Sequence, residues 1–299
     1  MNPRPAKVSE CQLAWPSFHA KVIRSQDNKL NLVKRIIYRA FQNRGYEIIR
    51  RKGRIIVVPN FPDDAFFERN RFIFDYLLDN QLLFLIEKLE INCVLDVGAN
   101  IGQFAQKLRR SGYNGYLVSF EPVQETYKKL KETSGKDPKW HVYPYALGSK
   151  DSTAEINITA SSVLSSFYHP NAHCDEFGAT EAAKIIRKET VDIRRLDSVI
   201  EEVSGHIDDA RFFLKMDTQG HDLDVFNGAG ECLDRIFGLQ SELAVIPIYE
   251  DIKRMNDIII EYESHGYEVA GFFPVNWDKK TLRVIEFDCV MVKSGLRNP

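Results

Sequence analysis

The sequence has no apolar run approaching the ~20 residues that are needed to cross a bilayer, and its mean hydropathy is −0.30. The first ten residues lack the apolar segment of a secretory signal, and the second residue is not the glycine that N-myristoylation requires. The five cysteines are odd in number and contain no Cys-x-x-Cys pair, which fits a reducing cytoplasm. These absences predict a cytoplasmic protein without a transmembrane segment.

An excess of charge of one sign is also missing from the chain as a whole. Forty Lys and Arg stand against 42 Asp and Glu, a net charge of −2, so we expect no nucleic-acid partner. The charge is unevenly distributed, because residues 1–54 carry +10 and residues 55–299 carry −12. Apolar residues make up 44% of the chain and aromatic residues 11%, which excludes wholesale disorder.

The first ninety residues are interpreted as an N-terminal extension that is rich in helix. Residues 1–28 lack periodicity and predict a loose arm, whereas residues 29–44 predict an amphipathic basic helix. This helix packs against a second helix at 66–89 in the plainest interpretation; a peripheral membrane contact, a homo-oligomer contact and an anionic acceptor chain stay open. Residues 46–50 and 54–58 predict a hairpin. The residues expected to be buried on the second helix are Leu77, Leu78, Leu82 and Leu85.

From residue 91 onward, short apolar runs alternate with helical patterns, which predicts βαβ units and a mainly parallel sheet with helices on both faces. Too few residues join the last two strands for a crossover helix, so these strands must pair antiparallel. The fold class is therefore a Rossmann-like α/β domain, residues 91–299, that follows the extension 1–90. Its predicted strands are 93–97, 116–120, 141–147, 212–216, 236–243, 267–272 and 284–292, and its helices are 101–111, 123–134, 221–233 and 252–265.

The most informative stretch is VLDVGANIG at residues 94–102, in which an apolar strand turns through two glycines into a helix. Glycine lets the backbone turn sharply and lets a ligand approach closely, and the next helix offers free N–H groups. The spacing Gly-x-x-x-Gly differs from the dinucleotide and triphosphatase patterns. The next strand ends in Glu121, whose carboxylate could accept both hydroxyls of a ribose, while Pro122 and Val123 offer an apolar surface for an adenine. A strand–helix turn without a ligand is the alternative.

The chain resembles the FkbM family of methyltransferases in six ordered motifs: VLDVGANIGQFA, SFEP, YALG, SSF, LKMDTQGHDLDVFNGA and LQSELAVIPIYE. The resemblance covers residues 91–293 and implies a class I methyltransferase fold with S-adenosyl-L-methionine (SAM) as cofactor. By that resemblance, the methionine part of SAM is cradled by Asp96, Gly98, Asn100 and Gly102, the ribose is held by Glu121, the adenine is lined by Ala146 and Leu147, and Ser165 and Ser166 lie near the cofactor.

Three residues are candidates for the catalytic step. Asp217 and His221 follow the strand at 212–216, and Glu242 ends the next strand, so all three should lie beyond the carboxyl ends of the strands, where ligands bind. Asp217 could orient the acceptor or take its proton, and His221 has the ordinary pKa nearest neutrality. The alternatives stay open: Asp217 as a helix cap, His221 as a surface residue, and Glu242 as a structural partner. Members of the resembled family often have an aromatic residue at the position of His221.

A metal site is not predicted. His169, His173 and Cys174 have a suggestive spacing, but Pro170 and Asn171 between the histidines favour a loop, and no fourth ligand follows. A divalent ion between Asp217 and Glu242 is left open without support.

The leading functional prediction is a SAM-dependent O-methyltransferase that acts on a hydroxyl of a carbohydrate or secondary metabolite. A nicotinamide-dependent oxidoreductase on the same fold is one alternative, against which the missing third glycine counts. The other is a catalytically inactive SAM-binding interaction module.

Overall fold

The computed structural model of the chain describes residues 46–51, 54–59 and 66–295, which fall into two compact units, Met1–Asp64 and Ala65–Pro299. In the first unit, β1 (Tyr46–Arg51) pairs antiparallel with β2 (Arg54–Pro59), which confirms the predicted hairpin. The predicted arm at 1–28 and the predicted basic helix at 29–44 lie outside the described residues.

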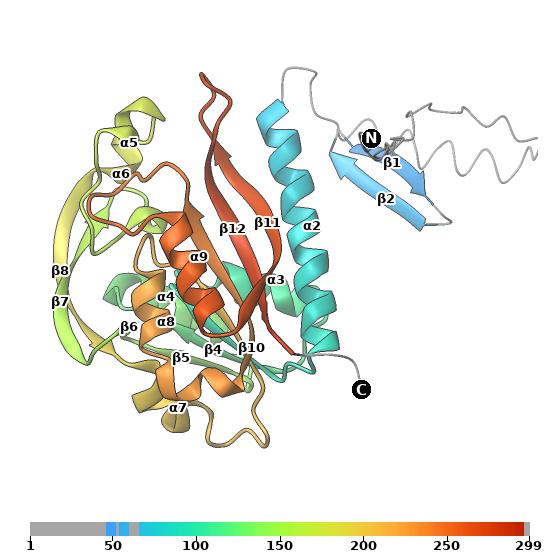
Figure 1. Cartoon of the computed structure of the whole chain (residues 1–299), viewed down its shortest axis with the longest axis vertical. Helices are drawn as coiled ribbons and strands as arrows, with labels where there is room; N and C mark the ends of the chain where they lie inside the picture. The colour runs from blue at the N-terminus through green and yellow to red at the C-terminus, as the bar shows by residue number, and fades with distance from the viewer. Residues whose placement is uncertain (1–45, 52–53, 60–65, 296–299) are drawn as a thin grey trace, which may run out of the picture. The chain divides into compact units, whose positions relative to one another are not determined.

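The second unit is built on a seven-stranded sheet in the order β11-β12-β10-β9-β3-β4-β5 (Figure 1). The four strands β3, β4, β5 and β9 are parallel to one another and to β10, whereas β12 runs antiparallel to both β10 and β11. This arrangement confirms the predicted class I methyltransferase fold with its antiparallel C-terminal strand. The strands are β3 (Cys93–Val97), β4 (Tyr116–Phe120), β5 (Trp140–Tyr143), β9 (Phe212–Met216), β10 (Ile236–Ala244), β11 (Tyr267–Trp277) and β12 (Val284–Lys293).

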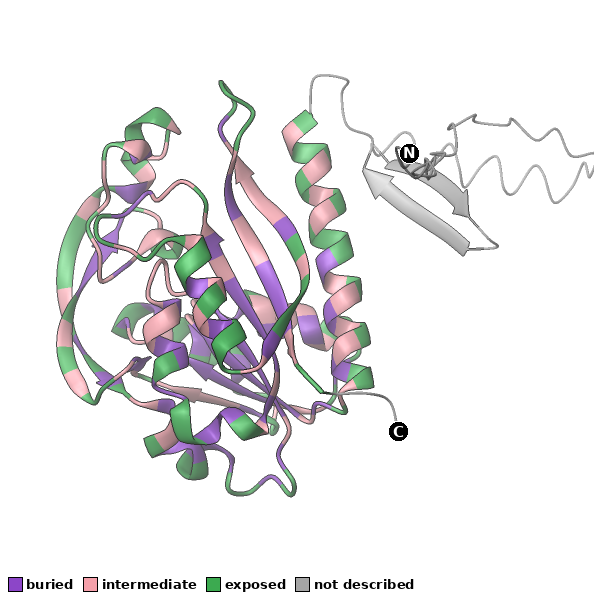
Figure 2. Ribbon diagram, viewed as in Figure 1, coloured by how far each residue is buried: buried purple, intermediate pink, exposed green. Residues whose placement is uncertain are grey.

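Helices cover both faces of this sheet because the strands are apolar on both sides, as buried parallel strands usually are. On one face, α7, α8 and α9 pack against Leu95, Leu214 and Leu239; on the other, α2 and α3 pack against Val94 and Phe213. Figure 2 shows the buried residues gathered in the sheet between these layers. The helices are α2 (Phe66–Lys88), α3 (Gln103–Arg110), α4 (Gln124–Ser134), α7 (Leu196–Ser204), α8 (Asp222–Asn227) and α9 (Met255–Ser264).

Two predicted elements differ from the structure. The predicted strand at 141–147 is split: β5 ends at Tyr143, and β6 (Ala146–Leu147) joins a separate three-stranded sheet with β7 (Ser152–Thr159) and β8 (Ile185–Arg194). The predicted helix at 221–233 is broken by Gly228 into α8 and the 3-10 helix η2 (Gly230–Arg235). The insertion between β7 and β8 holds η1 (Ser162–Leu164), α5 (His173–Glu176) and α6 (Thr180–Ala183).

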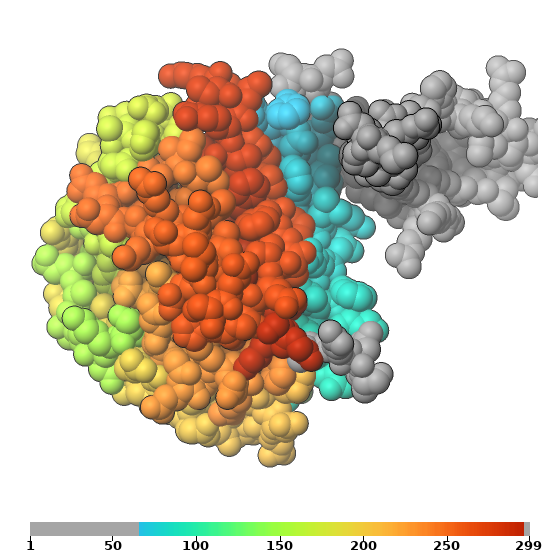
Figure 3. Space-filling model, in the orientation of Figure 1, coloured from blue at the N-terminus to red at the C-terminus, as the bar shows by residue number. Residues whose placement is uncertain are grey.

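Helix α2 belongs to the same compact unit as the sheet. This unit begins at Ala65, whereas the sequence predicted a domain that begins at residue 91. Leu78, Leu82 and Ile86 form its buried stripe at four-residue spacing, whereas Leu77 is 46% exposed, contrary to the prediction, because it lies about 100° around the helix from that stripe. Gln81 Nε2 donates to the carbonyl of Ala270, so α2 lies beside β11 (Figure 3). No helix among the described residues is both long and apolar enough to span a membrane.

The place of α2 predicts different outcomes for two truncations. Removing residues 1–64 should leave the second unit folded with its thermal unfolding midpoint nearly unchanged, because that unit keeps its whole core. Removing residues 1–90 should uncover the apolar face made by Phe213, Phe273 and Val290, and give an aggregated product. Size-exclusion chromatography and thermal melting check both variants. A soluble, monomeric 91–299 fragment with normal melting would contradict this role of α2.

Candidate active site

The carboxyl ends of the parallel strands meet at one edge of the sheet because the strands are in register. Val97 on β3 lies opposite Phe120 on β4 and Met216 on β9, so the loops that follow all three strands open at the same level. These loops line a cavity of about 490 Å³, which is also lined by residues of α2 and of the β7–β8 insertion. The cavity therefore lies where ligands bind in open α/β sheets.

The glycine loop after β3 has the backbone that its sequence predicted. Gly98 has φ +74°, and a Cβ at this position would lie 2.0 Å from the carbonyl oxygen of Asp217, so only glycine fits. Asn100 also has positive φ, and both residues line the cavity. The loop is fixed by the N–H of Gly98, which donates to the carbonyl of Phe120 at 3.1 Å. The result is a rigid cradle of backbone at the cavity wall.

Gly102 lies at the start of α3 and does not line the cavity. Its φ is +90°, and a Cβ would approach the ring of Trp140 at 2.8 Å. The second glycine of the motif therefore lets the start of α3 pack closely against Trp140 of β5.

Glu121 is buried at the end of β4, beside the glycine loop. One carboxylate oxygen accepts the N–H of Asn100 at 2.9 Å, and the other accepts the N–H of Val123 at 2.9 Å. Burial raises the pKa of Glu121 to about 7, although these two backbone hydrogen bonds oppose the shift. Each oxygen keeps a second lone pair, and the side chain lines the cavity, so the carboxylate can accept hydroxyl groups there.

Three of the four remaining residues that the sequence placed near SAM line the cavity, and one does not. Ala146 and Leu147 on β6 line the cavity with Pro122 and Val123, which form an apolar end. Ser165 also lines it, whereas Ser166 is buried outside it and its hydroxyl donates to the carbonyl of Gln219 at 2.8 Å. Ser166 thus supports the loop after β9.

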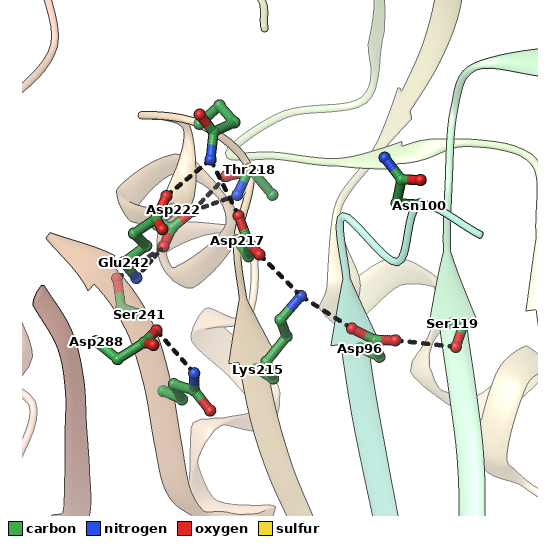
Figure 4. A network of polar contacts seen from close by, with 12 residues as sticks. Asp96, Asn100, Ser119, Lys215, Asp217, Thr218, Asp222, Ser241, Glu242 and Asp288 are labelled. Carbon is green, nitrogen blue, oxygen red and sulfur yellow. Dashed lines mark hydrogen bonds and ion pairs between the residues drawn. The ribbon is translucent and has the colours of Figure 1, made fainter. Parts of the chain in front are cut away.

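Asp96 and Lys215 form an ion pair beneath the cavity. Lys215 Nζ lies 3.2 Å from Asp96 Oδ1 and 3.5 Å from Asp217 Oδ2, and Asp96 is fully buried (Figure 4). Ser119 donates to the other oxygen of Asp96. Burial lowers the pKa of Lys215, but the carboxylates of Asp96 and Asp217 outweigh it and leave that pKa above its ordinary value. Asp96 does not line the cavity. Lys215, which does line it, connects the carboxylate of Asp96 to that of Asp217.

Asp217 and Glu242 are brought together by Gln219. Gln219 Nε2 donates to Asp217 Oδ1 at 3.2 Å and to Glu242 Oε2 at 2.7 Å (Figure 4). The hydroxyl of Tyr249 donates to Gln219 Oε1. Burial, then the neighbouring Glu286, raises the pKa of Glu242 well above its ordinary value. Asp217 is the more accessible of the two carboxylates, and its backbone carbonyl lies directly against Gly98 of the glycine loop.

Sequence reasoning missed Lys215 and Asp222. Asp222 is buried at the start of α8, where its carboxylate accepts the N–H of Thr218, the hydroxyl of Ser241 and the N–H of Glu242. It therefore ties the loop after β9 to β10. The signal for Lys215 was present in the sequence, because a single lysine inside an apolar strand must find an anionic partner.

His221 contacts a different part of the cavity from Asp217. The centroid of its ring lies 4.9 Å from that of the Phe167 ring, with the two planes tilted, and a Cβ on Gly148, directly after Leu147, would lie 3.0 Å from its Nε2. Burial lowers the pKa of His221, although Asp224 opposes the shift. The structure thus places His221 beside the apolar end of the cavity.

Among the described residues, no group of three or more His, Cys, Asp or Glu side chains is arranged to hold a metal ion. His173 Nδ1 instead lies 3.0 Å from Glu176 Oε2, and Cys174 is buried with its thiol directed at the carbonyl of Ile248.

The sequence model of the methyltransferase FkbM domain matches residues 96–269, which is more than half of the chain. No protein of curated function matches the chain significantly. Solved structures with a similar fold include fibrillarin of Aeropyrum pernix with natively bound SAM, 11% identical with a TM-score of 0.40 over 83% of each chain. Magnesium protoporphyrin IX methyltransferase of Synechocystis, with bound SAM, is 10% identical with a TM-score of 0.40 over 78% of this chain and 86% of that one.

Proposed function

The chain belongs to the FkbM methyltransferase family, and from this premise we propose that it transfers the methyl group of SAM to a hydroxyl of a carbohydrate or secondary metabolite. The observation that carries the proposal is the pairing of the glycine loop with Glu121 at one cavity wall. Gly98 lines the cavity with its backbone, its missing Cβ makes room for the carbonyl of Asp217, and the buried carboxylate of Glu121 stands beside the loop. A glycine-containing cavity wall beside a buried carboxylate fits the methionine and ribose parts of SAM.

In the proposed arrangement Gly98 and Asn100 hold the methionine part, Glu121 accepts the ribose hydroxyls, and Ala146 and Leu147 pack against the adenine. Bound SAM supplies an electrophilic methyl group on a sulfonium. The chain must align an acceptor hydroxyl with that methyl and take up the proton released when the new O–C bond forms. We assign the uptake of this proton to Asp217, because its side chain lines the cavity. Lys215 Nζ lies near Asp217 Oδ2 and holds the carboxylate in place.

The assignment of the ribose to Glu121 predicts a loss of SAM affinity in Glu121→Ala. Two ribose hydroxyls would lose their acceptor, which costs ~1–3 kcal/mol, or about 5–150-fold in Kd. Isothermal titration calorimetry measures the change. An unchanged Kd would mean that the ribose lies elsewhere.

The pKa of Glu121, about 7, adds a pH dependence to SAM binding. The carboxylate accepts hydroxyls better than the protonated acid, so affinity should rise from pH 6 to pH 8 and level off above this range. Glu121→Gln should flatten that rise. Asp288→Asn is the matched control, because Asp288 has a pKa of about 7 in the same cavity, and this variant should keep the rise.

Transfer of a labelled methyl group from SAM to a panel of carbohydrates and hydroxylated metabolites tests the activity itself. Calorimetry with NAD in place of SAM tests the oxidoreductase alternative. Binding of SAM without transfer to any member of the panel would favour the inactive interaction module.

A further inference from the structure

Four polar side chains line the cavity at the ends of β10 and β12, away from the glycine loop. Gln240 and Glu242 lie two residues apart on β10, so both face the same side of the sheet. Glu242 is paired with Asp288 on β12, and Glu286 lies two residues before Asp288, on that same side. All four line the cavity. We call these four residues the acceptor cluster.

The surroundings of the acceptor cluster are rich in acidic side chains. Seven acidic and three basic side chains line the whole cavity. Two of the basic residues already have carboxylate partners, since Lys215 pairs with Asp96 and Asp217, and Lys107 pairs with Asp79. The cavity therefore has more acidic groups than basic ones, and a positively charged ligand would favour their ionised forms.

A buried acceptor atom in the cluster has no hydrogen-bond partner in the described part of the chain. Gln240 is only 4% exposed, and its Nε2 donates to Asp288 Oδ1 at 2.8 Å, which fixes the orientation of the amide. Its Oε1 makes no hydrogen bond to the described residues. A buried carbonyl without a donor is costly. Because Gln240 lines the cavity, a ligand that brings N–H or O–H groups would satisfy it.

The carboxyl groups of the cluster and Asp217 also disfavour one another's ionisation, because Glu286, Asp217 and Asp288 add to the effect of burial in raising the pKa of Glu242. Burial raises the pKa of Asp288 to about 7, and Asp217 adds to the shift. Burial and the neighbouring Asp217 likewise raise the pKa of Glu286. A bound cation would relieve this repulsion, whereas a neutral ligand would leave it in place.

We propose that the acceptor cluster binds a protonated amino group of the methyl acceptor, so that the substrate is an amino-bearing polyol such as an amino sugar. An ammonium group has three donors and positive charge, which matches the unpaired Gln240 Oε1 and the carboxylates of Asp288 and Glu286. The cluster lies on β10 and β12, the second and third strands from β3 in the sheet, and therefore about 10–15 Å from β3. This distance separates the cluster from the glycine loop and the proposed methionine part of SAM. This inference rests on the proposed function.

The test measures ligand binding to the full-length protein loaded with S-adenosylhomocysteine, by calorimetry. The probes are glucosamine and kanamycin, with glucose as the neutral counterpart and Mg²⁺ as the metal counterpart. The amines should bind at least about tenfold more tightly than glucose. Asp288→Asn and Gln240→Met should each weaken amine binding about tenfold and leave the affinity for S-adenosylhomocysteine unchanged. Glu132→Gln, an exposed acid on α4, is the control and should change neither.

Three results would overturn the inference. The first is no preference for the amines over glucose, or no amine binding at about 10 mM. The second is an equal loss of S-adenosylhomocysteine affinity in the two variants, which would assign the cluster to the amino group of the cofactor. The third is Mg²⁺ binding that the variants abolish, which would make the cluster a metal site. Failure of S-adenosylhomocysteine itself to bind would instead count against the proposed function, since amine binding can be measured without it.

Discussion

Replacing Asp217 by asparagine is expected to lower turnover by about 10²–10⁴-fold while SAM affinity and folding stay nearly unchanged. The backbone of Asp217 lies against the glycine loop, and its side chain lines the cavity, where an acceptor hydroxyl would lose its proton. Asparagine keeps the shape and can still accept from Gln219, but it cannot take up the proton. Turnover is measured with labelled SAM on an acceptor found in the panel, and Asp208→Asn serves as control, because Asp208 is exposed and precedes β9, at the opposite end of the strand from Asp217.

The companion variant His221→Ala separates the two candidate bases. His221 packs beside Gly148 and Phe167 at the apolar end of the cavity, so its loss should weaken SAM binding by about tenfold or less, with turnover at saturating SAM largely kept. A large loss of turnover in His221→Ala together with full turnover in Asp217→Asn would reverse the assignment. Full turnover in both variants would move the role to Glu242 or to the substrate.

Replacing Lys215 by methionine is expected to destabilise the protein by ~3–5 kcal/mol, because it leaves the carboxylate of Asp96 buried without its partner. Asp96 is completely buried, and Ser119 is its remaining hydrogen-bond donor among the described residues. Urea unfolding at pH 8 measures the loss. The double variant Asp96→Asn/Lys215→Met should recover much of it, since neither ion then remains in the core.

The loss of stability in the single variant Lys215→Met should depend on pH in a specific direction. Burial raises the pKa of Asp96, and without Lys215 the main opposing charge is gone. A group whose folded-state pKa exceeds its unfolded value is stabilising at low pH and loses that contribution as pH rises through the folded value. The deficit of Lys215→Met relative to wild type should therefore shrink between pH 8 and pH 5. A deficit that stays constant over this range would contradict the assignment of the buried charge to Asp96.

The sequence predicted the fold because its local patterns and its chain connections agree. Apolar strands alternate with helices, so the sheet had to be mainly parallel, and the short link before β12 required an antiparallel final strand. The glycine loop and Glu121 could be predicted to meet for the same reason, because they follow strands that are adjacent and in register. Gly98 has the positive φ that its place in the turn indicated.

The predictions were weakest where a side chain's partner lies far along the chain. Nothing local to Asp96 shows that its carboxylate turns toward Lys215, 119 residues later, and away from the cavity. Ser166 supports the loop after β9 instead of lining the cavity, and His221 lies beside Gly148, for the same reason. The split of the predicted strand at 141–147 also depends on long-range pairing, since β6 leaves the central sheet to pair with β8.

By itself, the sequence determined the order of elements, the glycine loop and the edge of the sheet where ligands bind, because strand periodicity and backbone freedom are properties of neighbouring residues. Only the tertiary structure decided which carboxylates face the cavity and which are held by cations beneath it. It also made α2 part of the domain core and placed Gln240, Glu242, Glu286 and Asp288 together. Those arrangements depend on strand register and on burial, which set the charge and the pKa of each group, and no local pattern encodes them.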